Sequence, residues 1–275
     1  TTRQKPEGSP RRGWTTGACA TAAVTAAYQA LLTGVFPDPV TITLPRGQEP
    51  TFNLVRKELH KTQASASIIK DAGDDPDITH GAEIVVTVAL KKKPTGISFF
   101  AGDGVGTVTR PGLALDIGEP AINPIPRAMI KGVIKDLTEK YSVQDLPGIA
   151  ITISIPGGKV LAEKTMNGRL GIKGGLSILG TTGIVIPYSC SSWIHSIHRG
   201  VDVARAADLR HIAAATGSTS EAAAQKLLNL QDIALIDMGD FAGGLLKYLR
   251  KKPVERLTIA GGIGKLTKLA QGAMD

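Results

Sequence analysis

The stretch from Ala64 to Leu90 reads ASASIIKDAGDDPDITHGAEIVVTVAL, and it decides how the first half of the chain is interpreted. Residues 64–69 and 82–90 alternate or carry β-branched side chains, which is typical of two β-strands. Between them, residues 70–81 hold four aspartates, one histidine, two glycines and one proline. The sequence therefore predicts a rigid acidic loop between two strands.

This acidic loop is a candidate for proton transfer or for metal binding. Carboxylates that lie so close together repel one another, and such crowding can drive their pKa values apart. A solvated turn is the alternative, since Asp, Gly and Pro are the residues that turns commonly use. Composition alone leaves both interpretations open.

An alanine-rich segment from Ala18 to Leu32 contains no proline and predicts a helix. Thr15 or Thr16 is expected near its N-cap, and Gly34 is expected to end it. Small residues in the first turn would let a carboxylate or phosphate approach the exposed N–H groups. The alternative is a core helix whose small side chains simply pack tightly.

The region between residues 40 and 118 predicts several strands whose connections are too short for parallel crossovers, so an antiparallel sheet is expected. A helix is expected from Asn123 to about Tyr141, followed by strands at 149–155 and 159–165. Residues 167–183 then contain six glycines in seventeen positions. Such a backbone either turns tightly or is approached closely by a ligand, unless the segment is an ordinary interdomain loop.

Beyond residue 187, helices and short strands alternate, which predicts a parallel sheet. Ligands of such sheets bind at the carboxyl ends of the strands, and three of these ends carry glycine. The expected fold is an α+β domain with largely antiparallel strands at 1–187, and a smaller α/β domain with a parallel sheet at 188–275. The sequence holds no phosphate-binding G-x-x-x-x-G-K-[ST] motif, so ATP hydrolysis is not indicated.

Composition narrows the class of partner. The net charge of +8 favours an anionic ligand, while an aromatic content of 4% offers few platforms for single-stranded nucleic acid. No apolar run approaches the ~20 residues that span a bilayer, and the opening lacks the apolar core of a secretion signal. Two cysteines are too few for a disulfide framework or a structural zinc site, so we expect a protein of the reducing cytoplasm.

Four long motifs occur in one order along the chain. They are GWTTGACATAA (13–23), KDAGDDPDITHGAEI (70–84), GDGVGTVTRPGL with GEPAINPIPR (102–113 and 118–127), and NGRLGIKGGLSILGTTGIV (167–185). They closely resemble motifs of the CbiD family, the cobalt-precorrin-5B C1-methyltransferases of the anaerobic cobalamin pathway. The resemblance covers most of 12–185, and the downstream α/β segment fits the family in outline.

The resemblance implies transfer of a methyl group from S-adenosylmethionine to ring carbon C1 of a cobalt-containing tetrapyrrole. Acetate and propionate side chains make that macrocycle a polyanion, which suits a chain with a charge of +8. Cobalt arrives inside the substrate, so no protein ligand set is required. The competing hypotheses are a basic RNA-binding or scaffold module and a dinucleotide-dependent oxidoreductase. The second of these lacks a G-x-G-x-x-G motif between a strand and a helix.

Under this interpretation each candidate residue receives an expected role. The catalytic candidates for proton transfer are His80, Asp71, Asp74, Asp75 and Asp77. The cofactor-binding candidates are Thr15, Thr16, Gly17, Gly174, Gly175, Thr181, Thr182, Gly261 and Gly262. The candidates for the substrate carboxylates are Arg110, Arg127, Arg169 and Lys173. The expected partner is the anionic tetrapyrrole rather than nucleic acid or a membrane, and a homo-oligomer stays open.

Overall fold

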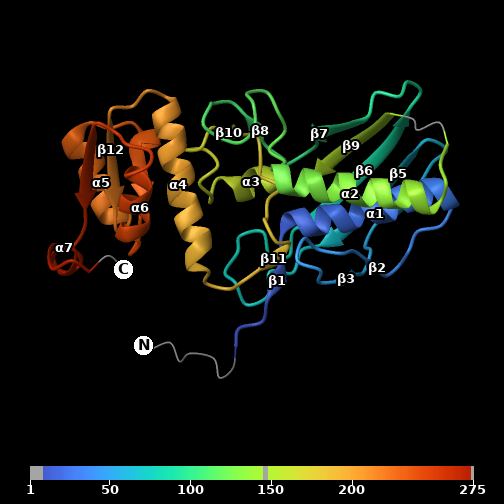
Figure 1. Cartoon of the computed structure of the whole chain (residues 1–275), viewed down its shortest axis with the longest axis horizontal. Coiled ribbons are helices and arrows are strands. Elements are labelled where there is room, and N and C mark those ends of the chain that lie inside the picture. Colours follow the sequence, from blue (N-terminus) through green and yellow to red (C-terminus); the bar gives the residue numbers. More distant parts are fainter. Residues whose placement is uncertain (1–8, 145–147, 274–275) are drawn as a thin grey trace. The chain divides into compact units, whose positions relative to one another are not determined.

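The computed structural model describes residues 9–144 and 148–273, which form two compact units (Figure 1). Unit 1 holds the described residues of Thr1–Val108, Gly118–Asn167 and Ile172–Tyr188. Unit 2 holds those of Thr109–Ile117, Gly168–Gly171 and Ser189–Asp275. In the described part of the chain, no helix has the length and apolar character needed to cross a bilayer.

Unit 1 is built on a five-stranded sheet in the order β4-β5-β6-β9-β7. Its strands are β4 (Lys57–Leu59), β5 (Gln63–Ile69), β6 (Glu83–Lys91), β7 (Ile97–Ala101) and β9 (Gly148–Ser154). Every neighbouring pair is antiparallel except β7 and β9. The expected antiparallel α+β architecture is therefore confirmed, and the acidic loop connects β5 to β6.

Three short antiparallel pairs complete the strands of unit 1. They are β1 (Gly13–Trp14) with β11 (Ile184–Val185), β2 (Val40–Thr41) with β3 (Thr51–Phe52), and β8 (Thr107–Val108) with β10 (Ile172–Lys173). Two of these pairs join segments that are far apart in sequence. Through them, the glycine-rich segment 167–183 and its continuation pair with both the start of the chain and the loop after β7.

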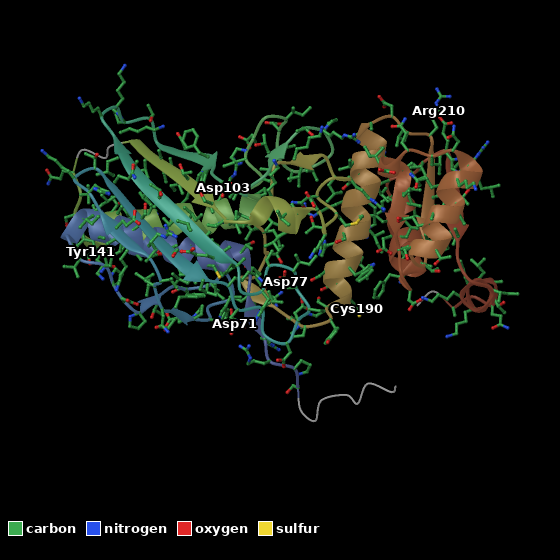
Figure 2. All side chains as sticks on the ribbon, turned by 180° about the vertical axis from the view of Figure 1, so that it is seen from behind. Asp71, Asp77, Asp103, Tyr141, Cys190 and Arg210 are labelled. Atoms are coloured by element: carbon green, nitrogen blue, oxygen red, sulfur yellow. The ribbon has the colours of Figure 1, made fainter. Side chains whose placement is uncertain are left out.

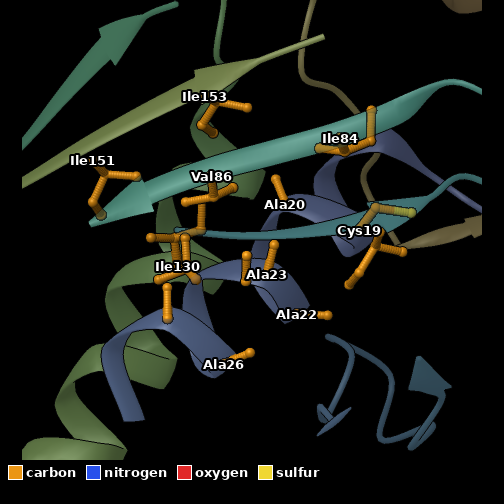
Figure 3. Close-up of a cluster of buried hydrophobic side chains, with 14 of the residues drawn as sticks. Cys19, Ala20, Ala22, Ala23, Ala26, Ile84, Val86, Ile130, Ile151 and Ile153 are labelled. Atoms are coloured by element: carbon orange, nitrogen blue, oxygen red, sulfur yellow. The ribbon is translucent and has the colours of Figure 1, made fainter. Parts of the chain in front are cut away.

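Helix α1 (Thr16–Thr33) is the centre of unit 1 and is buried on nearly all sides. Thr15 caps its N-terminus, and Gly34 ends it in the left-handed conformation at φ 82°, as predicted. A helix that is apolar all round needs cover all round. Figure 3 shows its alanines beside Ile84 and Val86 of β6, with Ile130 of α2 (Pro124–Lys140) nearby.

One expected strand is wrong. Residues 159–165 were expected to be extended, but Gly158–Ala162 form the short helix α3. Gly157 turns the chain at φ 75°, and its carbonyl then accepts hydrogen bonds from the N–H groups of Val160 and Leu161. A short apolar run has too few residues to distinguish a strand from one turn of helix, and here these local hydrogen bonds close the turn.

Unit 2 is an α/β unit with a three-stranded parallel sheet in the order β13-β12-β14, which confirms the expected parallel sheet. Its elements are α4 (Cys190–Ala206), β12 (His211–Ala215), α5 (Ser218–Leu228), a 3-10 helix (Asp232–Ala234), β13 (Leu235–Asp237), α6 (Ala242–Leu249), β14 (Arg256–Ala260) and α7 (Ile263–Ala270). Residues of α4 and α6 share one apolar cluster with the sheet, whereas α5 packs in a second cluster with Ala213 and Leu235. Because neighbouring residues of a strand face opposite sides, the helices cover both faces of the sheet.

Candidate active site

An ion pair between Lys70 and Asp77 holds the acidic loop in place. The Lys70 side chain is only 1% exposed, and its Nζ lies 2.7 Å from Oδ2 of Asp77. Asp77 also accepts hydrogen bonds from the backbone N–H and the hydroxyl of Thr79. Burial alone would raise the pKa of Asp77, but the Lys70 charge and these hydrogen bonds outweigh it and keep the pKa below its usual value. The pair therefore fixes the loop with Asp77 ionised.

The N-terminal segment also holds the acidic loop, whose Asp71 and Asp77 are labelled in Figure 2. The Arg11 guanidinium donates to both carboxylate oxygens of Asp71, and the Gly73 N–H adds a third hydrogen bond. These contacts hold the pKa of Asp71 at about 2. The backbone N–H of Arg11 donates to Asp74, and that of Tyr188 donates to Asp75. Each of the four aspartates thus accepts a hydrogen bond from within unit 1.

His80 differs from the aspartates because one of its nitrogens stays available. The backbone N–H of Ala72 donates to Nδ1 of His80 at 3.1 Å. An amide N–H can only donate, so Nδ1 must act as the acceptor and the proton of the neutral ring lies on Nε2. The His80 side chain is 52% exposed. His80 can therefore present an N–H donor to a ligand outside the loop.

The first turn of α1 is closed by the chain itself. The Gly17 N–H donates to the Leu179 carbonyl at 3.0 Å, and the Thr15 N–H donates to the Gly183 carbonyl at 2.9 Å. The Thr15 hydroxyl caps Ala18, while the Thr16 hydroxyl accepts from the Leu179 N–H. The polar groups of these predicted cofactor residues are therefore already bonded, either to the glycine-rich segment or, for the Thr15 hydroxyl, to the first turn of α1 itself.

Several glycines of that segment are required by close backbone packing. A Cβ on Gly175 would lie 2.2 Å from the Gly104 carbonyl oxygen, and one on Gly180 would lie 2.4 Å from the Thr15 hydroxyl. Gly174 has open space around it at φ 88°. Thr181 is exposed, and the half-buried Thr182 accepts a hydrogen bond from the Ile184 N–H. Among the predicted cofactor residues of this segment, Gly174 and Thr181 face open surroundings.

The four basic candidates divide into two pairs. Arg127 donates to the carbonyls of Ile122 and Pro120 and pairs with Glu119, so it braces its own loop. Arg169 forms two hydrogen bonds with Glu221 inside unit 2. Arg110 and Lys173 are exposed, and neither forms an ion pair within residues 9–144 and 148–273. These last two are the basic candidates with charge to offer a substrate.

Unit 2 holds a cavity of about 730 Å³ at the carboxyl ends of β12 and β14, which we call the β12/β14 crevice. Two predicted cofactor residues, Gly261 and Gly262, line it, and so does the Thr216–Ser220 segment that leads into α5. Asp237 ends β13, the strand on the other side of β12, and is paired in register with Ala215. The crevice therefore brings the ends of β12 and β14 to one site.

Two features of these sites were missed from the sequence. Arg11 belongs to a basic N-terminal tail, and its pairing with Asp71 joins positions 60 residues apart. The signal was the excess of negative charge in the acidic loop, which needed cations from elsewhere. Thr216, Gly217 and Ser218 follow one of the predicted strands whose carboxyl ends carry glycine, but the sequence did not assign them a role. Over the described ranges, no three His, Cys, Asp or Glu side chains gather to hold a metal ion.

Comparison with known proteins adds a family match and close relatives. Residues 3–187 match the model of the CbiD family. A cobalt-precorrin-5B C(1)-methyltransferase of Brucella anthropi is 60% identical over 276 residues, which cover 100% of this chain and 74% of that protein. The protein of the same name in Brucella canis is 63% identical over 266 residues, which cover 96% and 72%.

One solved structure is similar over almost the whole chain. It is the crystal structure of the cobalamin biosynthesis protein cbiD from Archaeoglobus fulgidus, with a TM-score of 0.52 and 28% sequence identity. The match covers 99% of this chain and 84% of that one. The likeness therefore includes both units.

Proposed function

The chain belongs to the CbiD family, and on this basis we propose that it methylates C1 of cobalt-precorrin-5B in cobalamin biosynthesis. The observation that carries the proposal is sequence identity of 60% to a methyltransferase of that name across the whole chain. All four motifs that led to the resemblance lie within the matched residues 3–187. Nothing in the comparisons favours an RNA-binding or scaffold module.

S-adenosylmethionine is the methyl donor in this proposal, and when bound it supplies an electrophilic methyl group on its sulfonium sulfur. The protein must hold the donor and the tetrapyrrole in line, so proximity and orientation account for much of the rate. Two glycines of the β12/β14 crevice, Gly217 and Gly262, have no atom within 4 Å of an added Cβ. The open space above them fits a ligand whose groups approach the backbone closely.

The substrate carboxylates call for basic side chains that are not already paired. Arg110 and Lys173 are exposed and meet this requirement, whereas Arg127 and Arg169 are committed to Glu119 and Glu221. The net charge of the whole chain also favours a polyanionic substrate, since a charge of +8 attracts negative groups. We assign carboxylate binding to Arg110 and Lys173 first.

Among the groups of the acidic loop, contact with the substrate is assigned to His80. Attack by an enamine-like C1 moves charge through the macrocycle, and a positioned acid or base can assist it. Asp71 and Asp77 are poor bases because their pKa values are held down, and Asp74 and Asp75 accept hydrogen bonds from backbone N–H groups. The Nε2–H of His80 is the remaining group in the acidic loop that can donate a hydrogen bond to an acceptor on a bound substrate, and the proton that the macrocycle loses on methylation leaves to solvent.

Single-turnover methylation of cobalt-precorrin-5B with labelled S-adenosylmethionine tests the proposal. We expect one methyl group per substrate with the unaltered chain, and no transfer would contradict the function. His80→Asn should slow the step by about 100-fold if the imidazole N–H positions the substrate for in-line transfer. His60→Asn is the matched control, because His60 is also exposed and lies in the turn between β4 and β5. An unchanged rate for His80→Asn would remove His80 from the mechanism.

A further inference from the structure

We propose that the β12/β14 crevice binds the adenosyl part of the methyl donor, with Asp237 beside it to accept hydrogen bonds from the ribose hydroxyls. The inference rests on the proposed function, because it takes S-adenosylmethionine as the donor. It adds a site in unit 2, outside the residues 3–187 that match the family model. Four observations support it, and they concern strand order, lining, glycine placement and the position of Asp237.

Strand order places a ligand site between β12 and β14. The chain runs from β12 through α5 to β13 on one side, and then through α6 to β14 on the other side of β12. Because α5 and α6 pack on opposite faces, the direction of winding reverses between β12 and β14. Open α/β sheets bind ligands at the carboxyl ends of the strands that flank such a reversal. The crevice lies at these two strand ends.

The size and lining of the crevice fit a nucleoside. Its volume of about 730 Å³ lies within the roughly 300–1,000 Å³ of small-molecule sites. Leu227, Leu228 and Leu266 supply apolar surface that can cover a purine ring. Thr216 and Ser218 bring hydroxyl groups to the same wall. An apolar surface with a few polar groups is the usual composition of a site for a partly polar cofactor.

Two glycines line the crevice although their backbone angles do not require glycine. Gly217 has φ 168° and ψ 170°, an extended conformation that any residue can adopt, and Gly262 has φ −65°. A Cβ on either would meet no atom within 4 Å. Neither glycine is therefore needed for the backbone turn or for packing. Their shared feature is that a side chain at either position would occupy the crevice.

Asp237 is not among the residues that line the crevice, but it stands at the adjoining strand end. It ends β13, opposite Ala215, so only the strand spacing of about 4.8 Å separates its backbone from the strand that leads to Thr216. Burial raises the pKa of Asp237, and the nearby Glu221 adds to the effect. Hydroxyl donors from a ligand would stabilise the ionised form.

The other predicted cofactor positions are less suitable. In unit 1, the Thr16 hydroxyl and the Gly17 N–H form hydrogen bonds to segment 177–183, and the Thr15 hydroxyl caps α1 at Ala18. The backbone of Gly104 occupies the space that a side chain at Gly175 would need. A nucleoside at the first turn of α1 would have to break these contacts. The crevice requires no such rearrangement.

Calorimetric titration with S-adenosylhomocysteine, the demethylated donor, tests the site without any turnover. Gly217→Leu and Gly262→Leu should each weaken binding by about 100-fold or more, since the new side chain takes the ligand's volume. Asp237→Asn should weaken it by about tenfold, the loss of one charge-assisted hydrogen bond. Gly264→Leu is the matched control, because Gly264 also has open space but lies outside the crevice lining. The Gly264→Leu variant should bind S-adenosylhomocysteine as tightly as the unaltered chain does.

The outcomes separate the site from the function. If the unaltered chain binds S-adenosylhomocysteine and both crevice variants bind it equally well, the site is wrong and the proposed function stands. If the unaltered chain binds none, the donor and therefore the proposed function are wrong. Emission of Trp193, which lies in unit 2, reports whether each variant remains folded. Gly217→Ala provides a smaller graded change, with weaker binding expected in proportion to the volume added.

Discussion

Similar glycine-rich stretches occur in unit 1 and unit 2, yet glycines within them have two opposite structural roles. In unit 1, Gly104 and Gly175 are glycines because another backbone occupies the place of their Cβ. In unit 2, Gly217 and Gly262 face open space. The first pair makes a scaffold, and the second pair leaves room for a ligand. Glycine density alone therefore identifies neither a loop nor a binding site.

The same contrast applies to the polar groups of the two units. The acidic loop and the first turn of α1 in unit 1 are satisfied internally by Arg11, Lys70 and the carbonyls of segment 179–183. In unit 2, hydroxyl groups of Thr216 and Ser218 line a cavity. This contrast is the reason for placing the methyl donor in unit 2.

The largest expected effect comes from a packed glycine of unit 1. Gly104→Ala places a Cβ within 1.9 Å of the Ile155 carbonyl oxygen at φ 71°, so both a collision and backbone strain follow. We expect a loss of about 3 kcal/mol or more in the free energy of unfolding of unit 1. Urea unfolding followed by Trp14 emission, in a Trp193→Phe background, measures it.

The matched change in unit 2 is Gly262→Ala, for which we expect a change within about 0.5 kcal/mol because the new methyl group meets nothing. Trp193 emission in a Trp14→Phe background reports on that unit. Equal losses for the two variants would break the distinction between packed and open glycines.

Local signals explain which parts of the fold were predictable. The bounds of α1 were predicted within two residues because Thr15 and Gly34 are cap residues that act on their own turn. The alternation in β6 marked one buried and one less buried face, and the parallel order of unit 2 followed from its regular helix–strand alternation. The segment 158–162 failed because five residues carry too little periodicity to distinguish a strand from a helix.

Long-range contacts explain what the sequence could not reveal about the sites. The collision that makes Gly175 necessary comes from Gly104, and the partner of Asp71 is Arg11. Both pairs are separated by 60 residues or more, so no local pattern reports them. The sequence did identify the acidic loop and the strand-end glycines as candidates. It could not distinguish the polar groups already bonded from those still open to a ligand.

A smaller effect is expected from the Arg11–Asp71 pair. The pKa of Asp71 is about 2 in the folded chain, below its ordinary value near 3.9. The stabilisation is therefore complete above about pH 4 and is lost as the pH falls towards 2. Arg11→Ala should raise the titration midpoint of Asp71 towards its ordinary value, as measured by carboxyl NMR.

The adjacent Arg12→Ala is the matched control for that titration, because Arg12 is exposed and forms no ion pair in the described ranges. It should leave the Asp71 midpoint unchanged. Equal midpoints for both variants and the unaltered chain would mean that Arg11 does not hold the acidic loop in solution. Unit 1 would then be more open than its contacts indicate.

Hydrogen exchange with and without S-adenosylhomocysteine tests the division between the two units most directly. Our account predicts slower exchange in residues 216–223 and 258–266, where the ligand covers the β12/β14 crevice, and unchanged exchange in residues 13–19 and 174–183. Protection of residues 13–19 and 174–183, with no change at the crevice, would place the donor at the first turn of α1 and contradict the account.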